Sequence, residues 1–169
     1  MKAAGAILAV AVALAIQTTL ARFLVRGSVA VDLVLVAVVY VSLTAGPVTG
    51  MLTGTFAGLI QDALSGGVIG IGGLAKTIVG FLAGIIGTQF IVAQPLPRFV
   101  VFFSATIVHA AIFMGLYILL EMRQFGTPYA AALGQAVGNA VVGVVAFQLV
   151  ELLPGAVERR RAGSSRLRR

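Results

Sequence analysis

Long apolar runs set the strongest limit on what this chain can fold into. The 169 residues are 60% hydrophobic and 10% charged, whereas soluble domains carry about 25% charged residues. A transmembrane helix needs about 20 apolar residues, and the chain divides into six runs of roughly that length. The runs are too long for the strands of a β-barrel and do not alternate. We therefore predict an all-α integral membrane protein with six transmembrane helices over residues 3–20, 29–45, 48–64, 74–92, 99–120 and 129–153.

The first run also has the pattern of a cleavable signal peptide. It has a basic start at Lys2, an apolar middle and a small residue at Ala21, as secretory signals do. We interpret it instead as the first spanning helix. The prediction is then one six-helix transmembrane domain over residues 1–158 and a basic cytoplasmic tail over residues 159–169.

Basic residues indicate the orientation of the chain. Six spans place both termini on the same side, and Lys and Arg favour the cytoplasmic side. Six of the twelve basic residues are arginines in the segment Arg159–Arg169, so we expect both termini in the cytoplasm, with Arg98 on that side. The remaining four basic residues and three acidic residues lie toward the outer face, namely Arg22, Arg26, Lys76, Arg123, Asp32, Asp62 and Glu121.

The charge of the tail limits the expected partners. The net charge of +7 is concentrated at this end of the chain, so it does not indicate binding to nucleic acid. A basic segment next to a membrane attracts anionic lipid, by about 1 kcal/mol per basic residue. We expect lipid contact for the tail, and a cytoplasmic protein is the alternative.

Small residues recur every four positions along the third run. Four residues advance about 400° around an α-helix, so such residues form one slowly drifting face. A glycine inside a helix costs about 1 kcal/mol relative to alanine, and close contact between helix backbones in a membrane offsets that cost. We predict that the face of Gly50, Gly54 and Gly58 packs closely on a neighbouring helix. The spacing as a whole comprises Gly46, Gly50, Gly54, Gly58, Asp62, Gly66 and Gly70.

Asp62 stands at the outer end of this face, directly before a loop rich in glycine. The segment Ser65–Gly73 contains five glycines, and Lys76 follows it. A carboxylate is costly to leave unpaired at this depth, so we expect an ion pair with Lys76 or hydrogen bonds from the loop. The alternative is contact with a partner or a lipid through Asp62, Ser65, Gly66, Gly70 and Lys76. The loop lacks the Lys and Ser/Thr of a phosphate-binding P-loop.

Polar residues near the middle of the last two runs form a second candidate. His109 and Asn139 lie at similar depth in antiparallel spans, so we predict an intramembrane polar pair. A buried interhelical hydrogen bond is one interpretation, and a proton relay is the other. Gln135 and Asn139 share a helix face with Gly134 and Gly138, which predicts a second close-packing face.

Few residues could carry chemistry. The chain has five acidic residues, one histidine and no cysteine, which excludes disulfides, thiolate metal sites and a thiol nucleophile. No nucleophile with a base beside it and no carboxylate pair can be recovered from the sequence. We therefore predict no enzymatic activity, no cofactor and no metal.

Three short motifs in the first four runs carry a family resemblance. The first run ends with Gln17 and Thr19, a Gln-x-Thr pattern, and the second opens with Asp32 and Leu33. The most specific motif is D-x-x-S-G-x-x-x-G after the glycine-rich run. Its matching residues and their continuation are Asp62, Ser65, Gly66, Gly70, Ala75, Gly80 and Phe81. Together these motifs resemble the MreD family of bacterial rod shape-determining proteins, in which a proline usually stands where this chain has Val31.

The resemblance implies a fold and a biological role. MreD-like proteins are similar in fold to the six-helix substrate-binding subunits of energy-coupling-factor vitamin transporters. They are multi-pass proteins of the bacterial cytoplasmic (inner) membrane, without enzymatic activity, and belong to the cell-elongation machinery. They act with MreC in cell-shape control and in the regulation of peptidoglycan synthesis. Through MreC they connect to MreB, RodA and a class B penicillin-binding protein, and a homo-oligomer inside that larger complex is compatible with the resemblance.

The similarity in fold also supplies a rival hypothesis, a small-molecule-binding membrane subunit of an energy-coupling-factor-type transporter. Such a subunit would offer a polar or aromatic-lined pocket open to the outside. The chain has no Trp and only three Tyr, and few polar groups fall in the outer halves of the runs. We therefore favour the scaffold over the transporter subunit.

Overall fold

The computed structural model describes residues 3–23, 31–66, 68–90, 94–120 and 129–166. Side chains are described over the same ranges except at residues 3, 20–23 and 153–166. Two sets of predicted positions lie outside the described side chains. They are the outer positions of Arg22, Arg26, Glu121 and Arg123, and the cytoplasmic positions of Lys2 and the tail.

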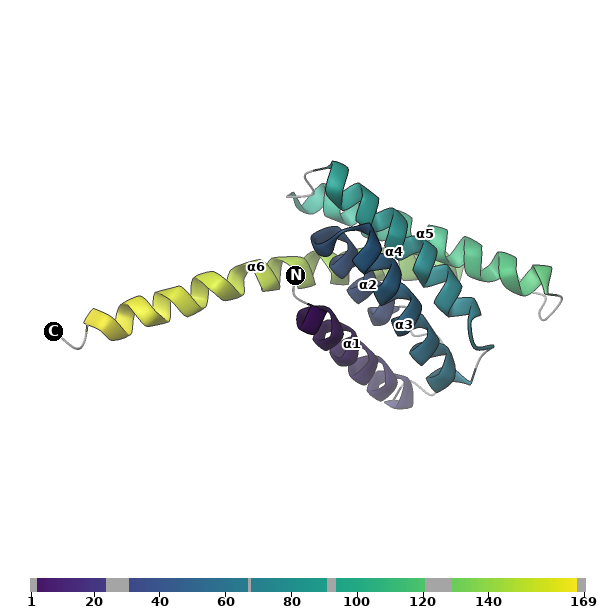
Figure 1. Cartoon of the computed structure of the whole chain (residues 1–169), viewed down its shortest axis with the longest axis horizontal. Coiled ribbons are helices and arrows are strands. Elements are labelled where there is room, and N and C mark those ends of the chain that lie inside the picture. Colours follow the sequence, from purple (N-terminus) through teal and green to yellow (C-terminus); the bar gives the residue numbers. More distant parts are fainter. Residues whose placement is uncertain (1–2, 24–30, 67, 91–93, 121–128, 167–169) are drawn as a thin grey trace.

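The described part of the chain contains six helices, one for each apolar run (Figure 1). They are α1 (Ala3–Phe23), α2 (Leu33–Ala45), α3 (Pro47–Ser65), α4 (Ile71–Gln89), α5 (Pro95–Leu119) and α6 (Tyr129–Arg166).

Several helix ends differ from the predicted ends. Pro47 and Pro95 lie in the first turns of α3 and α5, where a proline is tolerated because its missing N–H would have no helical partner. The helix α4 begins at Ile71, three residues earlier than predicted. The helix α6 continues to Arg166, past the predicted start of the tail, and in Figure 1 its last turns extend away from the other helices.

Three helices are long and apolar enough to cross a membrane. Among the described residues these segments are Ile71–Gln89, Pro95–Leu119 and Tyr129–Leu152. The apolar parts of α1 and α2, Ala4–Thr19 and Leu33–Ala45, are shorter. The described residues are therefore all-helical, as predicted, whereas six spans and the transporter-subunit fold remain predictions.

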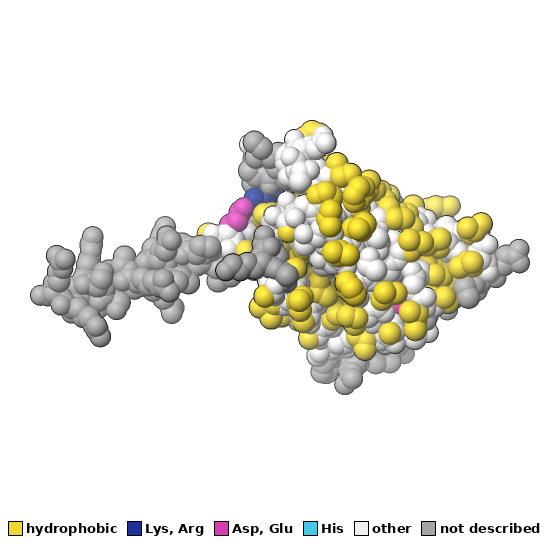
Figure 2. Space-filling view, viewed as in Figure 1, with side chains coloured by type: hydrophobic (Ala, Val, Ile, Leu, Met, Phe, Trp, Pro, Cys, Tyr) yellow, Lys and Arg dark blue, Asp and Glu magenta, His cyan; other side chains and the backbone are white. Residues whose placement is uncertain are grey.

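The bundle has apolar side chains both inside and outside. The helix α2 is central, and it takes part in two buried clusters. One cluster joins α2 to α4, α5 and α6 through Leu35, Val79, Phe102 and Ala140. The other joins α2 to α1 and α3. Figure 2 shows hydrophobic side chains spread across the outer face as well, as expected for a surface that meets lipid rather than water.

The closest helix contact is between α3 and α4. A methyl group built on Gly50 would overlap the carbonyl oxygen of Gly80, and one built on Gly54 would overlap that of Lys76. At Gly58 the overlap would be with Gly73. The three glycines therefore bring α3 into contact with the backbone of α4.

Gly134 lies in a different environment from these glycines. It is exposed, and a methyl group added there would meet no atom within 4 Å. Gly138 is half-buried. The predicted second packing face is thus wrong for Gly134 within this chain, because the side of α6 that carries it points outward.

Candidate functional site

Polar side chains from five helices converge inside the bundle. We call these residues the polar cluster, and all except Gln61 are almost completely buried. Buried polar groups are stable only when they are hydrogen-bonded or paired, so the contacts of each member decide what the cluster can do. The polar cluster consists of Asp32, Gln61, Lys76, Thr106, His109 and Asn139.

Asp32 is the centre of the cluster. It caps the N-terminus of α2, where its Oδ1 accepts a hydrogen bond from the Leu35 amide at 3.0 Å. Its Oδ2 lies 2.9 Å from the Lys76 ammonium, and both side chains are under 10% exposed. Gln61 Nε2 donates a further, longer bond to Oδ1 at 3.4 Å. These extra donors matter because a buried ion pair repays its loss of hydration only with good geometry and additional hydrogen bonds.

Lys76 connects Asp32 to His109. The ammonium nitrogen lies 3.2 Å from His109 Nε2. An ammonium group can only donate, so Nε2 accepts, and we assign the imidazole as neutral with its proton on Nδ1. The ring also stacks on Phe113, with centroids 5.8 Å apart.

Asn139 links α6 to two other helices. Its Oδ1 accepts from the Asp32 amide at 2.8 Å, and its Nδ2 donates to Thr106 Oγ1 at 3.1 Å. Thr106 in turn donates to the Phe102 carbonyl at 2.8 Å. His109 and Asn139 therefore do not bond to each other, which corrects the predicted pair. Thr106, one turn from His109, supplies the partner that Asn139 needs.

One acceptor in the cluster stays without a partner. Gln61 Oε1 is buried and accepts no hydrogen bond within the described part of the chain. Buried groups of this kind are uncommon in proteins. Among the buried polar side-chain atoms of the described residues, it is the single one without a hydrogen-bond partner.

Asp62 lies near the C-terminus of α3 and caps α4 across the loop. Its Oδ2 accepts from the amides of Gly70 at 2.9 Å and Gly73 at 3.1 Å. A carboxylate at a helix N-terminus satisfies amides that have no helical partner and is favoured by the helix dipole. Of the two expected partners, Asp62 therefore has the loop amides, whereas the Lys76 ammonium binds Asp32 instead.

The loop after Asp62 depends on two glycines with left-handed backbone. Gly66 ends α3 with φ of 66°, and Gly70 precedes α4 with φ of 109°. Other residues rarely adopt these angles. Ser65 donates its hydroxyl to the Asp62 carbonyl at 3.2 Å. The motif residues thus act together to form the connection between α3 and α4.

A second charge pair, in which only the arginine is buried, was not predicted from the sequence. Arg98 in α5 donates from Nη1 to Glu151 Oε2 in α6 at 2.9 Å, and from Nη2 to Oε1. The guanidinium also lies 4.1 Å from the centre of the Phe147 ring. Arg98 is buried, whereas the Glu151 side chain is 53% exposed. The sequence did contain a signal for this pair, because Arg98 and Glu151 have opposite charges and lie at neighbouring ends of the antiparallel fifth and sixth runs.

The contacts described above favour a structural role for the cluster. The ion pair is compensated, and the histidine is held between a lysine and an aromatic ring. Among the described residues, no three His, Cys, Asp or Glu gather as a metal site would require. The arrangement can hold five helices in register.

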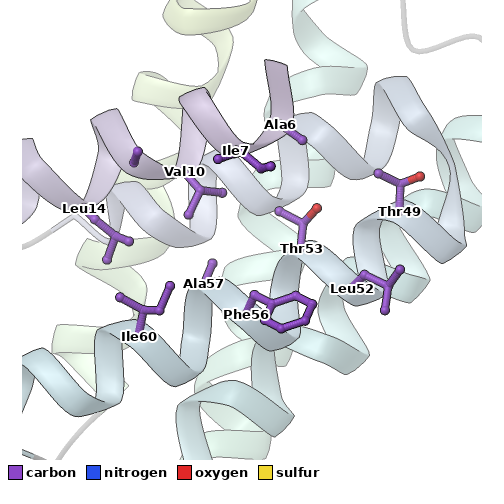
Figure 3. Close-up of a pocket in the computed structure, with 11 residues that line it drawn as sticks. Ala6, Ile7, Val10, Leu14, Thr49, Leu52, Thr53, Phe56, Ala57 and Ile60 are labelled. Carbon is purple, nitrogen blue, oxygen red and sulfur yellow. The ribbon is translucent and has the colours of Figure 1, made fainter. Parts of the chain in front are cut away.

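A groove of 530 Å³ lies between α1 and α3 (Figure 3). Its walls are aliphatic side chains and Phe56, together with the two threonines Thr49 and Thr53. It contains no charged side chain. This composition differs from the polar or aromatic-lined pocket expected of a small-molecule-binding transporter subunit.

Comparison with protein families decides the family of the chain. The family profile described as rod shape-determining protein MreD matches residues 3–153. The chain belongs to the MreD family. Searches of curated proteins and of solved structures find no match. MreD proteins are membrane proteins with a role in rod shape determination.

The MreD match covers all of the described contacts. Asp32 and Asp62, which belong to two of the three sequence motifs, each accept hydrogen bonds that cap a helix. The end of α6 after residue 153 lies beyond the matched region.

Proposed function

We propose that this MreD protein is a non-enzymatic scaffold of the bacterial cell-elongation complex. It acts with an MreC-type membrane protein, and through that protein with MreB, RodA and a class B penicillin-binding protein. The family match over residues 3–153 carries the proposal. The structure supports it because the buried charged side chains form ion pairs or hydrogen bonds within the bundle and serve to fix the helices.

The proposed arrangement is six spans in the inner membrane with both termini in the cytoplasm. Three helices are long and apolar enough to span, and the large exposed side chains of α1 and α3, such as Ile7 and Phe56, are apolar too. A cysteine placed at Gly163 tests the orientation. A membrane-impermeant thiol reagent added to intact cells should leave Gly163→Cys unlabelled, and labelling would reverse the layout.

The loop between α3 and α4 is the proposed contact with the periplasmic part of the partner. Ile69 is 66% exposed at this loop, and Ser65 and Gly66 are exposed as well. Asp62 and Gly70 set the conformation of the loop, and its exposed residues meet the partner. Lys76 and the glycine face stabilise α4 beneath it.

Complementation tests the proposed function. The chain is expressed in a rod-shaped bacterium whose own MreD gene has been deleted, together with the matching MreC-type partner. Rod shape should return, and the partner should copurify in detergent. Round cells that contain normal amounts of the inserted protein, with no recovered partner, would contradict the scaffold. A variant with Ile69→Ser should lower partner recovery while the protein keeps its melting temperature.

A further inference from the structure

The groove between α1 and α3 has a polar end and an apolar end. Thr49 and Thr53 lie beside Ala6 at one end, and Leu14 and Ile60 lie at the other (Figure 3). Both helices run in the same direction along the groove, so its polar end is next to their N-termini. That end is nearer to the membrane surface in the six-span arrangement proposed above, on which this inference rests.

The two threonine hydroxyls are free to bind an occupant. Other helical threonines in the described chain, such as Thr55, Thr77 and Thr106, donate to the carbonyl four residues earlier. Thr49 and Thr53 make no hydrogen bond to any described residue and are only half-buried. A hydroxyl in an apolar environment gains from an acceptor, so the occupant should carry acceptor oxygens at this end.

The length of the groove selects the kind of occupant. Ile60 lies eleven positions after Thr49, which corresponds to about 16 Å along a helix. One leaflet of the hydrocarbon core is about 15 Å thick. A transmembrane helix of a partner would need complementary surface over the whole thickness, yet the groove ends at Ile60 although α3 continues to Ser65.

We propose that this groove holds one acyl chain of a phospholipid from the leaflet in which α1 and α3 begin. The ester oxygens of the glycerol accept hydrogen bonds from Thr49 and Thr53, and the chain runs along the apolar walls toward Leu14 and Ile60. The first turn of α3 supports this orientation, since it begins at Pro47 without a side-chain cap. Amides at such a helix start favour anionic groups, and the lipid phosphate lies just above the esters.

Photolabelling tests the proposal. The full chain is placed in vesicles of phosphatidylethanolamine and phosphatidylglycerol that contain a phospholipid with a diazirine midway along one chain. After illumination, labelled peptides are mapped by mass spectrometry. We expect labels to concentrate on groove residues of α1 and α3, above the level at Ala63, an exposed residue of α3 outside the groove.

Three variants sharpen the experiment. Thr53→Phe should fill the groove and remove the concentrated label, whereas the matched variant Ala63→Phe should keep it. Thr53→Val keeps the shape and removes one donor, so labelling in the groove should fall about two- to tenfold, the equivalent of one hydrogen bond. This conservative variant decides the matter if Thr53→Phe fails to fold, which its melting temperature would show.

Several results would overturn the proposal. Even labelling of all exposed faces would show that no chain is held in the groove, as would unchanged labelling in Thr53→Val. Crosslinks from the groove to a copurified partner helix, with phospholipid label absent, would assign the groove to that helix. No label anywhere on α1 or α3, the Ala63 side included, would contradict the six-span arrangement itself.

Discussion

The helix α3 carries two rows of small residues with the same spacing and opposite environments. Gly50, Gly54 and Gly58 form the closed row, which meets the backbone of α4. Thr49 and Thr53 form the open row, which lines the groove toward α1, and Ala57 continues the spacing to a position that is completely buried against α1 and α2. The rows are offset by a single residue on the same helix and have the same spacing. Neither the helix nor the spacing can therefore explain why their environments differ.

The helix that faces each row explains the difference between the rows. Opposite the closed row, α4 supplies glycines of its own, Gly73 and Gly80, so that two backbones can touch. Opposite the open row, α1 supplies Ala6, Val10 and Leu14, so that side chains rather than backbones face each other across the groove. A spacing of four therefore predicts where a helix is narrow, but the facing helix decides whether that narrow face is closed.

The largest expected effect comes from enlarging the closed row. A leucine at Gly54 would overlap the backbone at Lys76, and backbone cannot rotate away as a side chain can. We expect Gly54→Leu to lower the free energy of unfolding by about 3 kcal/mol or more, the upper range for overpacked sites. The measurement is denaturation of the purified protein in detergent.

The neighbouring residue provides the matched control for that variant. Thr53→Leu adds a similar volume to the open row, where space exists, and should change stability by less than about 1 kcal/mol. Equal losses for Gly54→Leu and Thr53→Leu would remove the distinction between the two rows.

An effect of similar size concerns Lys76, whose backbone contacts the closed row and whose side chain reaches Asp32. Lys76→Met leaves the Asp32 carboxylate buried without its partner, at a cost of about 3–5 kcal/mol. Adding Asp32→Asn removes the stranded charge and keeps the cap of α2, since asparagine is a good capping residue. The double variant should therefore unfold at a higher temperature than Lys76→Met. A lower or equal unfolding temperature would mean that Lys76 does not stabilise the protein through its ion pair with Asp32.

A moderate effect is expected at Asp62, where the closed row ends. Asp62→Leu leaves the Gly70 and Gly73 amides without an acceptor, at about 1–3 kcal/mol for an unsatisfied buried group. Asp62→Asn keeps an acceptor oxygen, so its loss should be smaller. Melting temperature and partner recovery are measured together. If both variants lowered partner recovery at unchanged melting temperature, Asp62 would contact the partner instead of the loop.

The smallest effect is expected on the rim of the open row. Leu52 is 49% exposed and lines the groove. Leu52→Ala removes a side chain that already faces lipid in the proposed arrangement, so stability should stay within about 0.5 kcal/mol of the parent. A loss of several kcal/mol would show that this face is packed rather than open.

Much of the fold could be predicted because it depends on local pattern. The apolar runs located all six helices, and the spacing of Gly50, Gly54 and Gly58 located the narrow face of α3. Helix starts were less accurate. The glycine pair before Leu74 was interpreted as loop, although Gly72 and Gly73 lie in the first turn of α4, against Asp62 and Leu59.

The polar contacts depended on information that the sequence does not contain. Two partners were expected for Asp62, Lys76 or the loop amides, and the sequence could not decide between them. The loop amides bind Asp62, and Lys76 pairs with Asp32, the distant residue that caps α2. Asn139 was matched to His109 by depth alone, but rotation about the helix axis directs it to Thr106 and Asp32. Depth follows from counting residues, whereas the rotational setting of each helix follows from how all of them pack.

The contact between α3 and α4 also limits how the protein can move. Helices separated by side chains can slide past each other as rotamers change, but backbones in contact can slide only by losing that contact. The helices α3 and α4 should therefore move as one rigid body, with the Asp62 cap closing its end. Any change of shape transmitted through the membrane would have to occur at the looser contacts, where α1 lies across the groove. Distances between spin labels should accordingly stay fixed within the α3–α4 pair and vary between that pair and α1.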